Sequence, residues 1–505
     1  MPTIRDTGRQ RWVNWHQTVD QAVHQYFDVW NSDPNQSTVD GYNDTTRGLQ
    51  DLIRQADDAD RSLRAHGGTW SFSPIAATNG VLLNTRPLNY RFAIGANQVR
   101  ADYPGASRNR IYLAQCGMSV ADLNLYLKGK GHALRTCGAS NGQTIAGAIA
   151  TGTHGGALHH GAMEDFVVGL HLINAANESV WLERQSYPVL VDTIALKLAN
   201  RIVRDDAVFN AALVSFGSFG IVHGVLFEAE PMFFLQTWRK KLAITQASYD
   251  AITNLTFGPL NLPGGAGREP DHFQIVINPF DGLGNGLFTV MYRVPTVPAG
   301  SKPPDAGPSW TQGDSALEAI GLITDRFPFL TQPLASALTQ IGVTELDDVC
   351  GEPGQIFKDT TTRGKAAGAA FGVALDKTKE VLEIAAAHAV RLGAPALLAV
   401  RLVKSGQATL GFTRYPGATS VIDLDAPQSS RQQQFFRAVW QELDAKGIPF
   451  TPHWGKLNDL DASTVRLRYG TQPVDDWIAA RRSLLAPEVR HVFANEFTDR
   501  LGLSD

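Results

Sequence analysis

One stretch of this chain, residues 137–156, consists almost entirely of small or hydroxylated residues. It reads CGASNGQTIAGAIATGTHGG and contains no Asp, Glu, Lys or Arg. Small residues let a backbone lie flat against an extended or planar ligand, while hydroxyl and N–H groups satisfy the polar edge of that ligand. A glycine-rich loop packed on another strand is the alternative. The absence of charge favours a closely held ligand over a solvated loop.

A second segment, residues 64–73, reads RAHGGTWSFS and ends an expected strand in a polar turn with two glycines. Such a turn aims successive backbone N–H groups at one point, which suits a phosphate or pyrophosphate, although Gly-Gly after a strand is more often a plain turn. Neither segment is a G-x-G-x-x-G between a strand and a helix, and the P-loop pattern is absent from the chain. The commonest nucleotide folds are therefore excluded, and these residues alone do not name the ligand.

Composition narrows the class of protein. The 505 residues are 43% hydrophobic and 19% charged with a net charge of −4, which is typical of a globular protein of two to four domains. Without a run of Lys and Arg, we expect no nucleic-acid partner and no binding to an anionic membrane. No apolar run approaches the length of a membrane-spanning helix, and no apolar signal segment follows the N-terminus. We expect a soluble, cytoplasmic protein with a small-molecule substrate.

The side chains that could bind a metal are sparse. Three scattered cysteines, Cys116, Cys137 and Cys350, are too few for a disulfide framework, and an odd count fits a reducing compartment. His154, His159 and His160 lie close together in sequence but have no carboxylate or thiolate neighbours. Such a cluster is more often not a metal site, so we predict no metal.

Periodicity predicts an α+β fold. Short strands alternate with helices up to about residue 235, and strands 165–175 and 179–182 are expected to form a hairpin. A sheet-centred second domain is expected beyond that point, with an apolar stripe on its last helix. Its expected elements are strands 273–278, 287–294, 396–404, 409–415 and 420–424 and helices 377–392 and 432–447. We predict domains at 1–235 and 236–456 and a tail at 457–505.

At four places the sequence resembles the vanillyl-alcohol-oxidase-type (PCMH) flavoproteins, and within them the sugar-lactone and alditol oxidase branch. Residues 144–155, TIAGAIATGTHG, closely match the family's second loop, and PHWGK at 452–456 is the branch's C-terminal element intact. Residues 64–71 match the family's first loop, R-x-x-G-x-G-H-S, loosely, and FGSFGIV at 216–222 is close to L-G-x-x-G-I/V-V. The four elements occur in the family's order over about 400 residues.

The resemblance implies an FAD domain of two α+β subdomains, completed by the C-terminal tail, and a substrate (cap) domain over the flavin. It implies that Gly67, Gly68, Thr69 and Ser71 hold the pyrophosphate. Thr144, Gly147, Ala148, Gly152, Gly156 and Ala157 would line the flavin and its ribityl chain, with Ile221 and Val222 at the adenine end. The predicted cofactor-binding set also includes His66, Trp70, Ser140, Thr151, His154 and Gly220.

The attachment of the flavin is where the chain departs from the family. Many members carry a histidine bonded to the flavin 8α-methyl at the position of Trp70, and tryptophan cannot form that bond. We therefore predict non-covalent FAD. His66 and Cys137 lie near the positions of tethering residues and are the alternatives, although a strand histidine and a buried thiol are the commoner interpretations.

The expected reaction is oxidation of a CH–OH group of a small alcohol, polyol or lactone-like substrate. Hydride would leave the substrate carbon for flavin N5 while a base takes the hydroxyl proton, and a fixed cation would stabilise the negative charge at N1–C2=O. Lys456, in the PHWGK element, is the candidate cation, with a solvent-exposed lysine as the alternative. Arg401 aligns with the branch's E-x-R strand and is the second catalytic candidate.

The substrate and the electron acceptor are left open. Ala399 replaces the Glu of E-x-R, and Gly411-Phe412-Thr413 stands where alditol oxidases have a histidine. Two polar substrate contacts are therefore missing, which favours a less polar or larger alcohol over a polyol or a simple sugar lactone as the substrate. The acceptor is expected to be O2 or an unknown carrier. The same fold could instead serve an oxidative cyclase or C–N oxidoreductase of secondary metabolism, or a flavin-binding protein without turnover.

Overall fold

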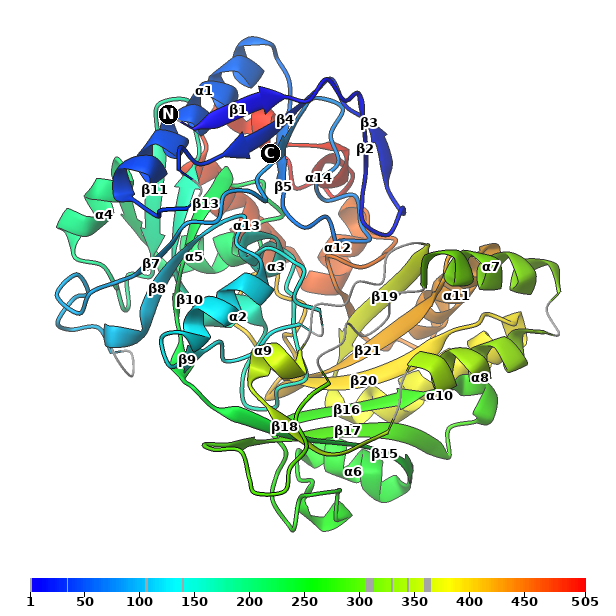
Figure 1. Cartoon of the computed structure of the whole chain (residues 1–505). Helices are drawn as coiled ribbons and strands as arrows, with labels where there is room; N and C mark the ends of the chain where they lie inside the picture. Colours follow the sequence, from blue (N-terminus) through cyan, green and yellow to red (C-terminus); the bar gives the residue numbers. More distant parts are fainter. Residues whose placement is uncertain are drawn as a thin grey trace.

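The computed structural model describes residues 2–33, 35–104, 108–138, 140–305, 313–327, 330–342, 345–357 and 365–505. The predicted α+β class is confirmed, because helices and three large sheets make up two regions that lie side by side (Figure 1). The beginning and the end of the chain build the first region, and the middle of the chain builds the second. The candidate site lies between them.

A four-stranded sheet of order β1-β4-β6-β5 opens the first region, and β4, β6 and β5 run parallel. Helix α1 (Val39–Asp58) covers it with Leu49, Leu52, Ile53 and Ala56 buried. The helix begins at Val39, because Thr38 caps it by accepting the Gly41 N–H at 3.0 Å. The strands are β1 (Thr3–Asp6), β4 (Gln25–Trp30), β6 (Val81–Asn84) and β5 (Leu63–His66).

A six-stranded sheet of order β12-β11-β10-β13-β8-β7 completes the first region. The predicted hairpin is confirmed, because β10 (Val167–Ile173) and β11 (Ser179–Glu183) pair antiparallel, with Leu170 opposite Leu182. Every residue of both strands is buried, as the continuous apolar runs predict. The other strands are β12 (Arg201–Arg204), β13 (Ile221–Glu228), β8 (Ile111–Gln115) and β7 (Arg91–Ala93), and the helices are α2 (Val120–Lys128), α3 (Ile145–Ala150), α4 (Asp192–Leu198) and α5 (Asp206–Leu213).

An eight-stranded antiparallel sheet of order β18-β15-β17-β16-β20-β21-β19-β22 forms the second region. Side chains alternate across a strand, so Leu398, Val400 and Leu402 join the core beneath the helices, whereas Arg401 points to the opposite face, toward the first region. The strands are β18 (Leu346–Gly351), β15 (Phe234–Ala243), β17 (Asn285–Val294), β16 (His272–Ile277), β20 (Leu397–Lys404), β21 (Ala418–Pro427), β19 (Ala366–Val373) and β22 (Thr451–Pro452).

The helices of the second region follow the sequence pattern. Helix α11 (Ser430–Ala445) buries Phe435, Phe436, Val439, Trp440 and Leu443, which confirms the predicted stripe. Helices α10 (Thr378–Leu392) and α6 (Gln246–Asn254) contribute to the same core. The remaining helices are α7 (Gly313–Arg326), α8 (Thr331–Gly342) and α9 (Pro353–Ile356).

The strand predicted at 409–415 is wrong. Phe412 and Leu410 are fully buried, which explains the apolar signal, but the backbone there turns. Its carbonyls serve other partners, since the Trp454 indole donates to the Leu410 carbonyl at 2.7 Å and Thr451 Oγ1 donates to the Phe412 carbonyl at 2.6 Å. No ladder pairing is left for a strand.

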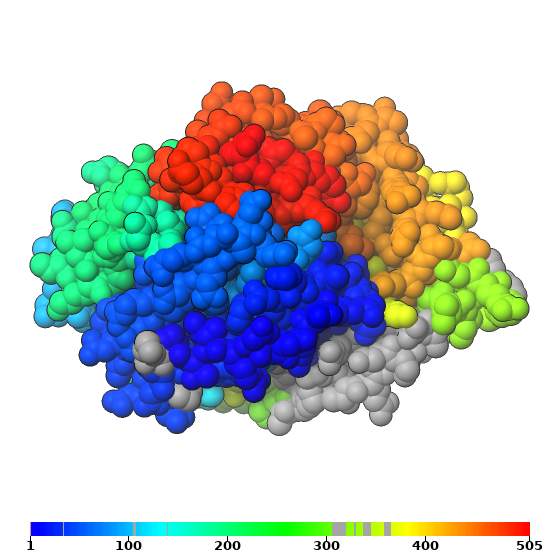
Figure 2. Space-filling view, turned by 90° about the horizontal axis from the view of Figure 1, so that it is seen from above, coloured from blue at the N-terminus to red at the C-terminus, as the bar shows by residue number. Residues whose placement is uncertain are grey.

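The C-terminal segment returns to the first region, where it lies beside the N-terminal residues on one face of the molecule (Figure 2). Asn495 Nδ2 donates to the Ile75 carbonyl at 3.0 Å, and the Trp477 indole donates to the Val214 carbonyl at 3.0 Å. The strands of the large sheet fall within 234–452, while the domain boundaries near 235 and 456 stay a prediction. The segment contains α12 (Ala462–Tyr469), α13 (Thr471–Leu484) and α14 (Glu496–Arg500).

Two small two-stranded sheets complete the fold. β2 (Arg11–Val13) pairs with β3 (Asp20–Ala22), and β9 (His132–Ala133) pairs with β14 (Glu230–Pro231). Within the described residues, none of the helices combines the length and the apolar character that crossing a bilayer would need.

Candidate cofactor and active site

A cavity of about 340 Å³ lies between the two regions, and both glycine-rich segments line it. This volume is within the usual range of ligand pockets. Most of the predicted site residues line this cavity: His66, Gly67, Gly68, Thr69, Trp70, Ser71, Ser140, Thr144, Gly147, Thr151, His154, Gly220, Ile221, Val222, Arg401 and Lys456. Elements that are far apart in sequence therefore converge on one site.

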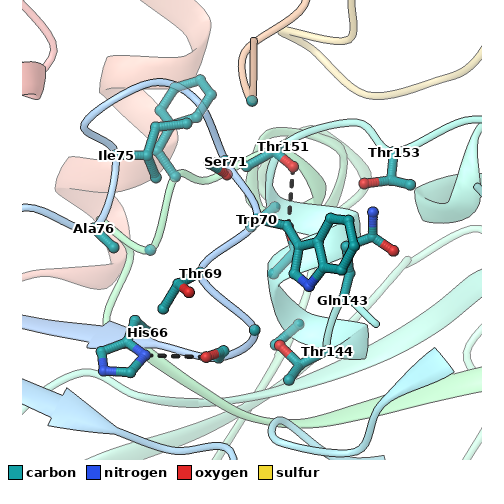
Figure 3. Close-up of a pocket in the computed structure, with 18 of the residues that line it drawn as sticks. His66, Thr69, Trp70, Ser71, Ile75, Ala76, Gln143, Thr144, Thr151 and Thr153 are labelled. Atoms are coloured by element: carbon teal, nitrogen blue, oxygen red, sulfur yellow. Dashed lines mark hydrogen bonds between the residues drawn. The ribbon is translucent and has the colours of Figure 1, made fainter. Parts of the chain in front are cut away.

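The two glycine-rich segments touch each other at their glycines. A Cβ on Gly67 would stand 1.9 Å from Thr144 Oγ1, and a Cβ on Gly68 would stand 2.7 Å from the Gly142 carbonyl oxygen. Neither position has room for a side chain. Thr69 follows with φ +60°, a left-handed conformation that a β-branched residue rarely adopts. The loop after β5 is thus held in one particular shape against the start of α3, as Figure 3 shows.

Arg64 holds the turn at residues 216–220 against the first loop. Its guanidinium, 2% exposed, donates to the carbonyls of Gly217, Ile75 and Phe493 at 3.1, 2.8 and 3.0 Å, and also to the carbonyl of Phe216. Burial lowers the pKa of Arg64 to about 9. The turn at 216–220, the first loop and the C-terminal segment are fastened together at this one side chain.

Gln143 is a cavity residue that sequence reasoning missed. Its amide lines the cavity beside Trp70 (Figure 3), and its buried Oε1 has no hydrogen-bond partner among the described residues. An acceptor left unpaired at a cavity wall costs free energy unless a ligand donates to it. Its position within the glycine-rich segment 137–156 could have identified it from the sequence as a cavity residue. Trp12, His16 and Phe72 also line the cavity without having been predicted.

Two cations stand at the end of the cavity formed by the second region. Arg401 and Lys456 are 16% and 22% exposed, and Asp423, 1% exposed, lies 3.6 Å from the first and 3.9 Å from the second. Lys456 Nζ also donates to Asp425 at 3.3 Å. The Arg401 guanidinium pairs with Asp423 but makes no hydrogen bond to any of the described residues, and it lines the cavity with N–H donors to spare.

Two neutral imidazoles flank these cations, with ring centroids 5.5 Å apart. His154 donates from Nδ1 to the Gly155 carbonyl at 2.9 Å, which leaves a lone pair on Nε2. His453 accepts the Gly455 N–H on Nδ1 at 2.9 Å, which places its proton on Nε2. Burial, reinforced by Arg401, lowers the pKa of His154 to about 3, and burial also lowers the pKa of His453 well below its usual value. The pair offers one acceptor and one donor.

Neither of the two alternative tethering residues is free to bond to a flavin in the cavity. His66 donates from Nδ1 to the Gly67 carbonyl at 3.0 Å and accepts on Nε2 from the Tyr26 hydroxyl at 2.8 Å, while burial lowers its pKa to about 4. Cys137 is 1% exposed in the apolar core, and burial raises the pKa of its thiol to about 12. It does not line the cavity.

Four predicted cofactor residues lie outside the cavity. Ala148 is buried in the core, and Gly152, at φ +75°, packs against Phe412. Gly156 accepts the Phe273 N–H at 3.0 Å and Ala157 bridges to His272, so both join the first region to β16. The described residues contain no group of three or more His, Cys, Asp or Glu side chains close enough to hold a metal ion.

This geometry defines an α+β protein with a cofactor cavity between its two regions. The FAD binding domain family matches residues 42–183. The L-gulono-1,4-lactone dehydrogenase of Mycobacterium tuberculosis is 24% identical over 463 residues, which is 90% of this chain and 93% of that protein. The D-arabinono-1,4-lactone oxidase of Eremothecium gossypii is 29% identical over 182 residues, 36% of this chain and 30% of that protein.

Among solved structures, cholesterol oxidase from B. sterolicum superposes with a TM-score of 0.71 at 17% identity, covering 99% of this chain and 97% of that one. This similarity shows a shared fold. The family match, the relatives and the fold together support a PCMH-type FAD flavoprotein near the sugar-lactone oxidase branch. It is an FAD-dependent oxidoreductase.

Proposed function

We propose that FAD binds non-covalently in the cavity and that the Arg401–Lys456 end is where a CH–OH group is oxidised. The cavity suits FAD because glycines of both loops line it with bare backbone, and because Gln143 Oε1 lacks a donor among the described residues. The predicted pyrophosphate and adenine contacts remain proposals, as do the roles of Ala148, Gly152, Gly156 and Ala157.

The observation that carries the proposed reaction is the Arg401 guanidinium, which lines the cavity end beside Lys456 and makes no hydrogen bond to any described residue. FAD, when bound, supplies a two-electron acceptor at N5. The Lys456 ammonium provides fixed positive charge where negative charge develops, and Arg401 binds a substrate oxygen. Asp423 and Asp425 hold the two cations in place. His154 Nε2 can accept a hydrogen bond from the substrate hydroxyl, and His453 Nε2–H can donate one.

The proposed substrate is a small alcohol, polyol or lactone. The names of the matched relatives support a lactone, since they are a dehydrogenase of L-gulono-1,4-lactone and an oxidase of D-arabinono-1,4-lactone. Phe72, whose ring centroid lies 5.1 Å from Lys456 Nζ, adds an aromatic surface at this end of the cavity, which favours a less polar alcohol over a simple polyol. O2 or a separate carrier would reoxidise the flavin, and the odd, scattered cysteines favour action in the cytoplasm.

The substitution Lys456→Met tests the role of the cation. It should leave FAD bound and slow anaerobic flavin reduction at least tenfold, about 1.4 kcal/mol of barrier. Lys404→Met is the matched control, because Lys404 is exposed at the end of β20, three residues after Arg401, and does not line the cavity. Wild-type reduction kinetics in Lys456→Met would remove Lys456 from the reaction.

Acid precipitation tests the attachment. Flavin should appear in the supernatant, because the position that tethers flavin in relatives is Trp70, His66 uses both ring nitrogens and Cys137 lies outside the cavity. Flavin retained in the pellet would contradict non-covalent binding and leave FAD binding itself intact.

A further inference from the structure

The N-terminal hairpin reaches the cofactor cavity although no part of it was predicted to bind anything. β2 and β3 form a two-stranded sheet of their own, and the turn between them carries Trp15 and His16. Trp12 and His16 line the cavity. Two aromatic side chains of this hairpin therefore line the cavity, and a third, Trp15, contacts the Trp70 ring of the first cofactor loop.

The aromatic side chains of this turn stack on those of the first cofactor loop. Trp15 lies parallel to Trp70, with ring centroids 5.1 Å apart and planes 14° apart. His16 lies parallel to Phe72 at 4.2 Å and 6°. Figure 3 shows the Trp70 indole standing in the cavity beside Gln143 and Thr144. Trp15 thus backs a flat aromatic surface on the cavity wall.

Hydrogen bonds fix the hairpin turn to the same loop. The Trp15 N–H donates to the Thr69 carbonyl at 3.0 Å, Asn14 Nδ2 donates to the Ser71 carbonyl at 2.8 Å, and Thr18 Oγ1 donates to the Phe72 carbonyl at 2.7 Å. These bonds set the height and tilt of Trp15 against Trp70, so the stack is pre-organised before any ligand arrives.

We propose that Trp15 and Trp70 form an aromatic shelf on which a flat ring of FAD stacks, and that this shelf retains the cofactor without a covalent bond. The inference rests on the proposed non-covalent binding in this cavity. Both ring systems of FAD are planar, and stacking on an aromatic side chain strengthens binding about tenfold or more. Trp15 positions Trp70 and is therefore a cofactor-positioning residue on an element outside the predicted cofactor set.

The test compares Trp15→Phe with Trp15→Leu. Both side chains are apolar and fill most of the space, but only phenylalanine keeps a ring. Apoprotein is titrated with FAD while quenching of flavin fluorescence is followed. We expect the dissociation constant to stay within about threefold of wild type in Trp15→Phe and to rise at least tenfold, with weaker quenching, in Trp15→Leu. Trp30→Ala is the control, since Trp30 lies on β4 under Arg5 and away from the cavity.

Each outcome decides the proposal. Equal dissociation constants for the Phe and Leu variants overturn the shelf while leaving non-covalent FAD in place. If Trp30→Ala weakens binding as much as Trp15→Leu, the effect is general destabilisation and the shelf is likewise overturned. If flavin stays with the wild-type protein after acid precipitation, both non-covalent binding and the shelf are overturned. This is the one outcome that also contradicts the proposed function, because the first two bear on the shelf alone. Circular dichroism of each apoprotein confirms folding, and Trp70→Phe against Trp70→Leu repeats the comparison from the other side of the stack.

Discussion

Gly67 should be the position where one methyl group most weakens cofactor binding. A Cβ there would stand 1.9 Å from Oγ1, 2.7 Å from Cγ2 and 2.8 Å from Cβ of Thr144. All three distances are below van der Waals contact, and Thr144 is 2% exposed at the start of α3, so it has nowhere to move. Gly67→Ala must therefore push the first loop away from α3.

The magnitude follows from the cost of overpacking. Forcing a methyl group into a packed site costs about 1–3 kcal/mol, and each 1.4 kcal/mol is a tenfold change in an equilibrium constant. If the two loops must close around FAD, most of this cost weakens the free energy of FAD binding, and only a smaller part lowers the stability of the fold. The dissociation constant for FAD should then rise about 5- to 150-fold, with a smaller loss of melting temperature.

The assay is titration of apoprotein with FAD, and Thr144 provides a rescue. Thr144→Gly removes all three clashing atoms at little cost, because Thr144 makes no side-chain capping bond. The double variant Gly67→Ala/Thr144→Gly should bind FAD more tightly than Gly67→Ala and as tightly as Thr144→Gly alone, whereas Gly284→Ala, with nothing within 4 Å, should match wild type. Wild-type affinity in Gly67→Ala, or no recovery in the double variant, would refute the view that these loops meet around the cofactor.

Three further predictions concern charge, thiol and pH. Asp423→Asn leaves Arg401 and Lys456 without their shared buried carboxylate. The free energy of unfolding, measured in urea, should fall by about 1–3 kcal/mol, and flavin reduction should slow. An unchanged reduction rate would show that Asp423 has no part in the reaction. Cys137→Ala should leave the FAD dissociation constant unchanged, because the thiol lies outside the cavity; flavin lost only in this variant would contradict that. Acidification should destabilise the fold between pH 6.5 and about 4, because the buried imidazoles of His66, His154 and His171 have lowered pKa values and bind protons only after unfolding. Together the three imidazoles should lower the free energy of unfolding by about 4 kcal/mol for each pH unit in this range. A urea midpoint that stays constant from pH 7 to 5 would contradict this.

Local patterns in the sequence were enough to predict much of the fold. Continuous apolar runs located the β10–β11 hairpin, and a helical stripe located α11 and its buried face. Both depend on residues close in sequence. The short strands of the first 30 residues were not predicted, because their exposed residues give neither a clear alternation nor a buried run. At 409–415 buried apolar residues were mistaken for a strand, since burial does not reveal where backbone hydrogen bonds go.

The candidate site divides in the same way. The glycine-rich loops were visible because they are contiguous, and Gln143 sat within one of them. Asp423 was missed because it meets Arg401 only through the pairing of β20 with β21, where it lies opposite Ala399, and it meets Lys456 only through the turn that follows β22. Trp15 was missed because its partner, Trp70, is 55 positions away on an unrelated element. Contacts that depend on sheet register or on docking of a hairpin leave no local signal.

The most direct test of the central claim is anaerobic mixing of the purified protein with CH–OH compounds, beginning with L-gulono-1,4-lactone and D-arabinono-1,4-lactone, while the visible absorption of the flavin is followed. The account predicts that at least one such lactone, polyol or alcohol bleaches the flavin, and that Lys456→Met slows this bleaching while Lys404→Met does not. Flavin that dithionite reduces but no compound of these classes bleaches would contradict it.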